Sequence, residues 1–171
     1  EDRQVTISRA KFTVTYPCSF MLVASMNPSP SGFFVDRNNP LSSSSIETQR
    51  YLNKISGPLL DRIDLHIEVN PVPFEEISSK KTSESSHQIR QRVIAARTIQ
   101  LRRFKDSTTV HYNAQMNVKQ IRKYCDINKE SLDLLKTAMD RLNLSARAYD
   151  RILKVARTIS DLADEQEILP N

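Results

Sequence analysis

The sequence contains only two glycines in 171 residues, Gly32 and Gly57. A phosphate-binding loop of the Gly-x-x-x-x-Gly-Lys-Ser/Thr type needs two glycines five positions apart, so that its backbone N–H groups can surround a phosphate. Gly32 and Gly57 are too far apart for such a loop, and neither precedes a lysine. If the chain belongs to a nucleotide-driven machine, these residues therefore form only part of it.

Cysteine and histidine are also scarce, and they are scattered along the chain. Cys18 and Cys125 lie in no metal-ligand spacing, so we expect two buried or half-buried thiols in a reducing compartment. The histidines, His66, His87 and His111, are equally dispersed, and the sequence predicts no metal site. Apolar runs are shorter than a membrane span, and no signal-peptide pattern begins the sequence, so we expect a cytoplasmic protein without a membrane partner.

The length and the charge of the chain leave several function classes open. A chain of 171 residues forms one ordinary domain or two small ones, and 39% hydrophobic with 26% charged residues is ordinary for a globular protein. The net charge of +5 permits a nucleic acid or a phosphate as partner without requiring one. The sequence begins at Glu1 and not at Met, so we expect a fragment of a longer protein.

The first seventy residues carry patterns that predict strands. Residues 4–16 alternate polar with apolar or β-branched side chains, which predicts a β-hairpin with Ser8–Lys11 near its turn. Residues 20–26 form a continuous apolar run, which is typical of a strand covered on both faces of a sheet. Residues 63–69 alternate Ile, Leu, Ile and Val with Asp, His and Glu, which predicts a half-buried strand.

The residues between these strands predict a loop and short helices. Prolines, asparagines and serines indicate a loop over 27–45, followed by a helix over 46–55 with Ser45 as its N-cap. Gly57 and Pro58 restart the chain as a short helical turn. Two core strands and a hairpin are too few for a complete parallel sheet, so residues 1–72 are interpreted as the end of an α/β layer.

A polar linker over 73–86 leads into a helical region over 87–171. Apolar residues at helical spacing predict helices over 86–104, 118–125, 129–142 and 146–163. In the first helix we expect the inward face to consist of Ile89, Val93, Ala96 and Leu101 or Phe104. In the last helix the predicted inward stripe is Tyr149, Ile152, Leu153, Ala156, Ile159 and Leu162. Each stripe is interpreted as the core of a helical bundle.

Asn27 and Arg62 are candidates for contact with a phosphate or an attacking water. Asn27 follows the predicted strand over 20–26, at the edge where ligands bind in open α/β sheets, although an Asn-Pro turn explains it equally. Arg62 lies on a short helix, where a rigidly presented guanidinium can reach a phosphate on a neighbouring subunit. The alternative for Arg62 is a local salt bridge with Asp61 or Asp64.

Arg147 lies in the first turn of the last predicted helix, with Ser145 as the expected N-cap. A helix N-terminus favours anions, and Arg147 adds a full positive charge there, although a solvated surface arginine remains the alternative.

Two further groups of cations are candidates for contact with nucleic acid. Arg9 and Lys11 lie at the tip of the predicted hairpin, and by analogy the pore-facing hairpins of ring motors use such tips to grip strands. The helix over 86–105 carries several arginines and a lysine spread around its circumference, which indicates a solvated face or a nucleic-acid contact.

Three segments in this order are specific enough to indicate a family. They read Val23-Ala-Ser-Met-Asn-Pro28, Ser56-Gly-Pro-Leu-Leu-Asp-Arg-Ile-Asp-Leu65 and Leu144-Ser-Ala-Arg-Ala-Tyr-Asp-Arg-Ile-Leu-Lys-Val-Ala-Arg-Thr-Ile-Ser-Asp-Leu162. The combination closely resembles the magnesium-chelatase-like AAA+ ATPases of bacteria, the ComM/YifB group, over nearly the whole chain. The resemblance implies an α/β fragment of a P-loop AAA+ domain, consisting of a β-hairpin and the last core strands, followed by an all-α helical lid bundle.

The same resemblance implies a role for each candidate. Asn27 matches the sensor-1 position, Arg62 matches the arginine finger of the Leu-Leu-Asp-Arg motif, and Arg147 matches the sensor-2 arginine of the lid. The hairpin with Arg9 and Lys11 resembles the family's pre-sensor-1 insertion.

The resemblance also implies the cofactors and the assembly. The Walker A and Walker B motifs would precede Glu1, so we expect the chain alone to be inactive and the intact protein to be an ATPase that uses ATP and Mg²⁺, with most Mg²⁺ ligands upstream. We expect a homo-oligomeric ring, with a hexamer as its size. Three functions stay open: DNA remodelling or branch migration, a chelatase-type motor on a protein partner, and a non-catalytic nucleic-acid-binding module over 86–105.

Overall fold

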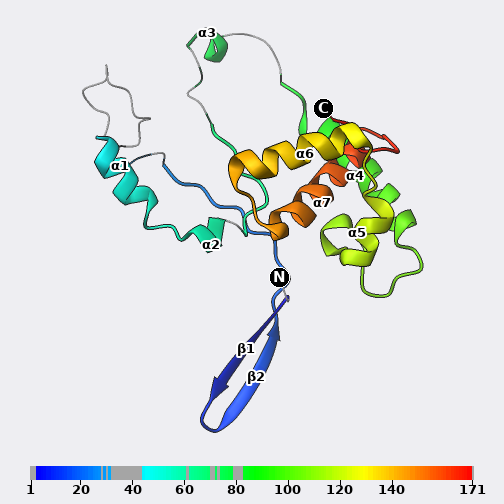
Figure 1. Cartoon of the computed structure of the whole chain (residues 1–171), viewed down its shortest axis with the longest axis horizontal. Coiled ribbons are helices and arrows are strands. Elements are labelled where there is room, and N and C mark those ends of the chain that lie inside the picture. Colours follow the sequence, from blue (N-terminus) through cyan, green and yellow to red (C-terminus); the bar gives the residue numbers. More distant parts are fainter. Residues whose placement is uncertain are drawn as a thin grey trace. The chain divides into compact units, whose positions relative to one another are not determined.

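The computed structural model describes residues 3–27, 29, 31, 44–60, 62–69, 72, 74–78 and 83–170 (Figure 1). Its contacts divide the chain into two compact units, Glu1–Ser56 and Gly57–Asn171. The first unit contains β1 (Gln4–Arg9), β2 (Phe12–Pro17) and α1 (Ser45–Leu52). The second contains α2 (Gly57–Leu60), α3 (Phe74–Ile77), α4 (Ser86–Arg103), the 3-10 helix η1 (Asn113–Gln115), α5 (Val118–Tyr124), α6 (Lys129–Leu142) and α7 (Ala146–Leu162). The domain boundaries at 72 and 86 stay a prediction.

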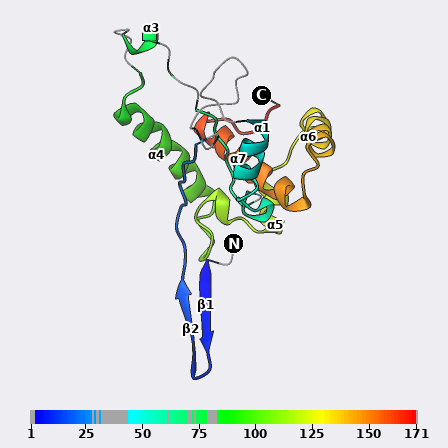
Figure 2. The same cartoon turned by 90° about the vertical axis from the view of Figure 1, so that its left-hand side faces the viewer.

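The predicted hairpin is confirmed, and its two faces differ in chemistry. β1 and β2 pair antiparallel with Arg9 opposite Phe12, and Figures 1 and 2 show the two strands side by side. Because alternate residues of a strand point to opposite faces, one face carries hydroxyl groups, and the Thr6 and Thr15 hydroxyls hydrogen-bond at 2.9 Å. The other face is apolar and exposed, with Val5, Ile7, Phe12 and Tyr16 on it.

The strands predicted over 20–26 and 63–69 are wrong in this structure. Both segments are irregular, and their apolar side chains face solvent, with Met21 86% and Ile67 80% exposed. A strand needs a neighbouring strand to complete its backbone hydrogen bonds. Among the described residues, β1 and β2 pair only with each other, so neither segment has such a neighbour. The described chain therefore combines one hairpin with a mostly helical remainder.

The starts of α1, α4 and α5 are stabilised by capping boxes. In a capping box the N-cap side chain accepts from the backbone N–H three residues later, and the side chain of that later residue accepts from the N-cap backbone N–H. α1 is capped by Ser44 and not by Ser45, because the Glu47 N–H donates to Ser44 Oγ at 3.2 Å while the Ser44 N–H donates to Glu47 Oε2 at 3.0 Å. α1 also ends at Leu52, three residues before its predicted end. Ser85 and Gln88 form the same box at the start of α4.

The helices predicted after residue 86 are confirmed, and α7 is central among them. α7 contacts α4, η1 and α5. The apolar core consists of Phe104, Val110, Met116, Ile121, Cys125, Leu153 and Ile168. Burial raises the pKa of the Cys125 thiol to about 11, and Cys18 is half-buried, so the expected burial of both thiols is confirmed.

The predicted inward faces are only partly correct. In α4 the buried residues are Ala96 and Gln100, followed by Phe104, whereas Ile89 and Val93 are exposed. Burial in α4 is therefore confined to its C-terminal half, where it contacts α7. In α7 the predicted inward residue Ile159 is 61% exposed, and Leu153, Arg157, Ser160 and Asp161 are the buried residues.

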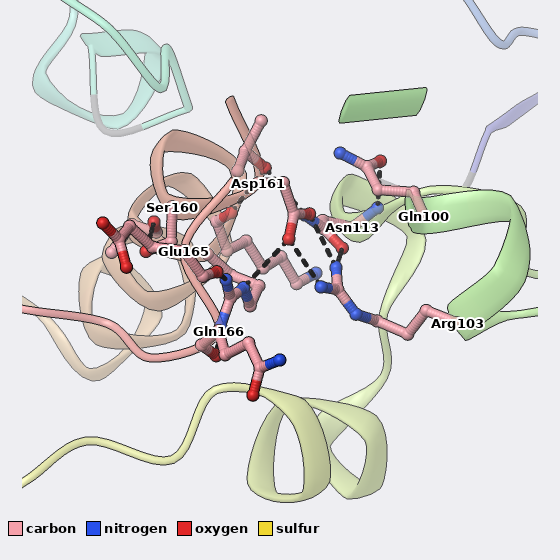
Figure 3. Close-up of polar contacts among 11 residues, drawn as sticks. Gln100, Arg103, Asn113, Ser160, Asp161, Glu165 and Gln166 are labelled. Carbon is pink, nitrogen blue, oxygen red and sulfur yellow. Dashed lines mark hydrogen bonds and ion pairs between the residues drawn. The ribbon is translucent and has the colours of Figure 1, made fainter. Parts of the chain in front are cut away.

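The carboxylate of Asp161 in α7 accepts hydrogen bonds from side chains of three elements, α4, η1 and α7 itself (Figure 3). Arg103, the last residue of α4, donates from Nη1 and Nη2 to the two carboxylate oxygens at 2.6 and 2.5 Å. Asn113 of η1 donates from Nδ2 to Oδ2 at 2.7 Å, and Arg157 donates from Nε to Oδ1 at 3.2 Å. The Asp161 side chain is fully removed from solvent. This set of Asp161, Arg103, Arg157 and Asn113 is called the Asp161 network below.

The groups around the Asp161 network are themselves satisfied. Asn113 Oδ1 accepts from Arg103 Nη1 at 2.7 Å, and the Asn113 N–H donates to Gln100 Oε1 at 3.1 Å (Figure 3). Arg157 reaches past the end of α7 and donates to the carbonyl oxygens of Glu165 and Gln166 at 2.5 and 2.7 Å. The network therefore joins α4, η1, α7 and the segment that follows α7.

Burial on its own would raise the pKa of the Asp161 carboxyl, because it disfavours the charged form. The hydrogen bonds from Arg103 and Asn113, with the charges of Arg103 and Arg157, outweigh burial and hold this pKa below its usual range. A carboxyl whose pKa is lower in the folded state stabilises the fold above its ordinary pKa of about 4. That contribution is lost as the pH falls toward the lowered value.

We expect Asp161→Asn to destabilise strongly the second unit, Gly57–Asn171, which is called the helical unit below. The amide keeps the shape of the side chain but removes its charge, so the buried Arg157 and the largely buried Arg103 lose their counter-charge, which costs about 3–5 kcal/mol. Urea unfolding of the 171-residue chain measures the change in the free energy of unfolding.

The matched control for this variant is Glu84→Gln. Glu84 pairs with Arg92 at 2.8 Å on the surface, where an ion pair contributes about 0–1 kcal/mol. A loss for Asp161→Asn that is no larger than the loss for Glu84→Gln would contradict the central role of the Asp161 network.

Candidate functional site

Arg62 follows α2, and its guanidinium folds back onto that helix. Arg62 Nη1 donates to the carbonyl oxygen of Pro58 at 2.6 Å, which fixes the direction of the side chain. The residue is exposed, and this is its one hydrogen bond with a side-chain donor among the residues that the structure describes. A guanidinium has five N–H donors in a rigid fork, so the described residues leave most donors of Arg62 for a phosphate.

The expected alternative of a salt bridge between Arg62 and Asp64 is wrong, because Asp64 pairs with Arg151 of α7. Arg151 Nε donates to Asp64 Oδ1 at 2.6 Å, between residues 87 positions apart in the sequence. The Arg151 side chain is 20% exposed, and the Asp64 side chain is 61% exposed. The other alternative partner, Asp61, lies outside the described residues.

Arg147 occupies the first turn of α7, at a sharp change of chain direction. Asn143 ends α6 in the left-handed conformation with φ of 49°, which asparagine tolerates well. Ser145 then caps α7 as predicted, because its Oγ accepts from the Ala148 N–H at 3.3 Å. Arg147 is exposed and has no hydrogen bond or ion pair with a described residue.

The position of Arg147 is unfavourable for the isolated helix. The N-terminus of a helix carries a partial positive charge, and a cation there destabilises the helix by about 0.3–1 kcal/mol. A residue that breaks a local rule without a compensating contact is typical of a functional position. An anion bound at this helix end would remove the conflict, because it would interact with both Arg147 and the helix N-terminus.

The structure joins Asp64 to Arg151, and the candidates Arg62 and Arg147 lie close to this pair in the sequence. Arg147 and Arg151 are four residues apart and share one face of α7. Arg62 is two residues before Asp64, which is held by Arg151. We call this set the arginine junction. Sequence analysis missed the contribution of Asp64 and Arg151, although the spacing of Arg151 from Arg147 is a signal that could have identified it.

The remaining candidates lie in the first unit. Asn27 is exposed and belongs to an irregular segment, and the position of Pro28 lies outside the described residues. Arg9 is the last residue of β1, and Lys11 lies in the turn between the strands, so both exposed cations lie at the hairpin tip. Their predicted roles stay predictions.

Several of the cationic side chains of α4 interact with other side chains of the same chain. Arg103 belongs to the Asp161 network, and Arg92 pairs with Glu84. The guanidinium of Arg97 lies over the ring of Tyr112, 4.8 Å from its centroid. The helix therefore offers fewer unengaged cations to a nucleic acid than its sequence indicates.

The described part of the chain has neither a metal-binding cluster nor a membrane-spanning helix. Within these residues no group of three or more His, Cys, Asp or Glu side chains is placed to hold a metal ion. In the same residues no helix combines the length and the apolar character needed to cross a membrane.

Comparison with known protein families accounts for most of the chain. Residues 83–171 match the family described as magnesium chelatase, subunit ChlI C-terminal, and residues 1–77 match magnesium chelatase, subunit ChlI. The chain belongs to the magnesium chelatase ChlI family. This confirms the resemblance identified from the three sequence segments.

Curated relatives extend the comparison to nearly the whole chain. The competence protein ComM of Haemophilus influenzae is 43% identical over 98% of this chain, and the uncharacterized protein YifB of Escherichia coli is 42% identical over 99%. An uncharacterized protein of Mycobacterium bovis is 34% identical over 95%. The chain spans 32% of the length of each of these relatives, so it corresponds to about a third of them.

We expect Arg147→Ala to leave the stability of the chain unchanged or to raise it slightly. The substitution removes a cation from a helix N-terminus, where it costs about 0.3–1 kcal/mol, and alanine favours the helix. Thermal unfolding of the 171-residue chain measures the effect. A clear loss of stability would show that Arg147 is a structural residue, and it would remove the argument for a functional one.

Proposed function

We propose that the chain is the C-terminal part of the ATPase module of a ring-forming AAA+ motor, in which it completes a nucleotide site begun by other residues. The observation that carries this proposal is the arginine junction, in which most side-chain donors of Arg62 and Arg147 have no partner among the described residues. Asp64 could have neutralised Arg62, but its carboxylate is bound to Arg151 instead. Membership of the magnesium chelatase family supports the same reading.

The described residues fit the phosphates of ATP better than they fit Mg²⁺. Two exposed guanidiniums and a helix N-terminus suit anionic oxygens. The described residues offer no carboxylate cluster that could hold Mg²⁺. When bound with ATP, Mg²⁺ would neutralise phosphate charge, and its ligands would come from other residues of the protein.

Each candidate would make one contribution to hydrolysis. Arg147 would bind the γ-phosphate from the lid and link the lid position to the nucleotide state. Arg62 would reach the ATP of the neighbouring subunit, where a guanidinium stabilises the charge that develops on the transferring phosphoryl group. The amide of Asn27 would orient the attacking water. Hydrolysis would then require assembly, because the site draws residues from two subunits of the ring, for which we expect a hexamer.

Two outputs of such a motor are compatible with the chain, and one feature favours DNA. The hairpin places Arg9 and Lys11 at an exposed tip, where cations can contact a phosphate backbone. We therefore propose DNA remodelling, such as branch migration, as the output. The family description favours a second candidate, a chelatase-type motor that acts on a protein partner. A non-catalytic nucleic-acid module on α4 is the least supported, since Arg92, Arg97 and Arg103 have internal contacts.

We expect Arg62→Ala in the full-length protein to abolish most ATP turnover while ATP binding is retained. Removal of an arginine finger lowers kcat by about 10³-fold or more. Steady-state hydrolysis and binding of a fluorescent ATP analogue measure the two properties separately. Arg92→Ala is the matched control, because it removes an exposed arginine that pairs on the surface. Turnover near the wild-type value in Arg62→Ala would overturn the assignment.

We expect forked DNA to stimulate the ATPase of the full-length protein, and the double variant Arg9→Ala with Lys11→Ala to lose the stimulation. The basal rate without DNA is expected to stay unchanged in this variant, because the hairpin tip contributes nothing to the nucleotide site. Rates with and without DNA, at two salt concentrations, check this. A rate that is indifferent to DNA would favour the chelatase-type motor.

A further inference from the structure

We propose that the ion pair between Asp64 and Arg151 couples two nucleotide sites of the ring, because it ties the segment that carries Arg62 to the helix that carries Arg147. The inference rests on the proposed function and extends it, since it names the positioning residues that connect a subunit's own ATP with its neighbour's ATP. Neither Asp64 nor Arg151 needs to touch nucleotide for this role.

The path from Arg147 to Arg62 through the ion pair is short. Arg147 lies four residues before Arg151, which is about one helical turn and about 6 Å along α7. Asp64 lies two residues after Arg62, which is at most about 7 Å of chain. With the Nε–Oδ1 distance of 2.6 Å, a movement of the first turn of α7 is therefore passed to Arg62 through one contact.

The direction of the coupling follows from how each partner is held. Arg151 belongs to a long helix, its side chain is only 20% exposed, and α7 is fixed by the Asp161 network. Asp64 belongs to an irregular segment, and its side chain is 61% exposed. We therefore expect α7 to be the rigid partner. When α7 moves, the segment that carries Asp64 and Arg62 moves with it.

The charges at the junction support a positioning role for Asp64. Arg147 and Arg151 are like charges on one face of α7, and Asp64 neutralises Arg151, the one farther from the helix N-terminus. Arg147 therefore keeps its charge for the phosphate. Because Asp64 binds Arg151, its carboxylate does not pair with Arg62. The Arg62 guanidinium donates to the Pro58 carbonyl oxygen instead. Among the described residues, one ion pair thus leaves both candidate arginines without a competing carboxylate.

The test uses the full-length protein with Asp64→Asn, Arg151→Gln, the double variant, and the charge swap Asp64→Arg with Arg151→Asp. Steady-state ATPase gives kcat, the KM for ATP and the Hill coefficient. For each single variant we expect kcat to fall by up to about 5-fold, because an ion pair with an exposed partner can transmit no more than the small free energy that it contributes, with little change in KM. The Hill coefficient should fall toward that of independent sites, and the double variant should be no worse than either single variant.

The charge swap and a control separate coupling from loss of structure. The swap restores attraction between the two positions, so we expect it to recover part of kcat and of the cooperativity. Glu84→Gln, which breaks an exposed ion pair on α4, should leave kcat and the Hill coefficient at wild-type values. Wild-type cooperativity in Asp64→Asn and Arg151→Gln, or additive effects in the double variant, would overturn the inference.

Arg62→Ala and Arg147→Ala, measured alongside, distinguish the two possible failures. If both of these variants lose turnover while the ion-pair variants behave as wild type, the proposed function stands and the coupling role is wrong. If both keep normal turnover, the proposed nucleotide site itself is wrong. Amide hydrogen exchange at Arg62 and Ile63, whose N–H groups donate to the carbonyl oxygens of Leu59 and Leu60, reports how firmly this segment is held, and Asp64→Asn and Arg151→Gln should accelerate exchange there to the same extent.

Discussion

The helical unit depends on one constraint, which is that the buried carboxylate of Asp161 stays ionised and fully hydrogen-bonded. Its partners Arg103 and Arg157 are themselves nearly buried, so each charge in the group is tolerated only because the others are present. Asn113 completes the arrangement as a neutral member that both accepts and donates. An apolar core tolerates many substitutions of similar volume, whereas this network requires particular groups at particular distances. It therefore fixes the orientation of α7 relative to α4 and η1 more specifically than the apolar contacts do.

Because of this constraint, the two ends of α7 differ in burial and in role. Asp161 lies fourteen residues after Arg147, which is about 21 Å along the helix axis. The C-terminal end is buried in the network, and the N-terminal end carries the exposed Arg147 and the half-buried Arg151, whose side chain is 20% exposed. A rigid helix held at one end can present side chains at its other end in a defined place. In this way the network stabilises the arginine junction without contacting any of its residues.

Local patterns in the sequence predicted the local structure correctly. Contacts between residues far apart in the sequence could not be predicted from these patterns. The hairpin over 4–16 and the four helices after residue 86 follow from alternation, spacing and capping residues within a few positions of each other. The strands predicted over 20–26 and 63–69 failed because a strand is completed by a partner elsewhere, and the described residues include none. Of the candidate site, sequence identified Arg62 and Arg147 but assigned Asp64 a local partner, because the contact with Arg151 spans 87 positions. The Asp161 network was invisible for the same reason, since Arg103 and Asp161 are 58 positions apart.

The two ionic groups of the helical unit differ in a way that suits different roles. A fully buried pair is expensive to break, about 3–5 kcal/mol, so it serves to hold one arrangement. An ion pair that is largely exposed contributes about 0–1 kcal/mol, so it forms and breaks at little cost. A motor needs both kinds, because a contact that transmits a change of state must have two accessible arrangements, while the scaffold around it must have one. The exposure of Asp64 is therefore an argument for a moving part at the arginine junction, and the full burial of Asp161 is an argument for a fixed one.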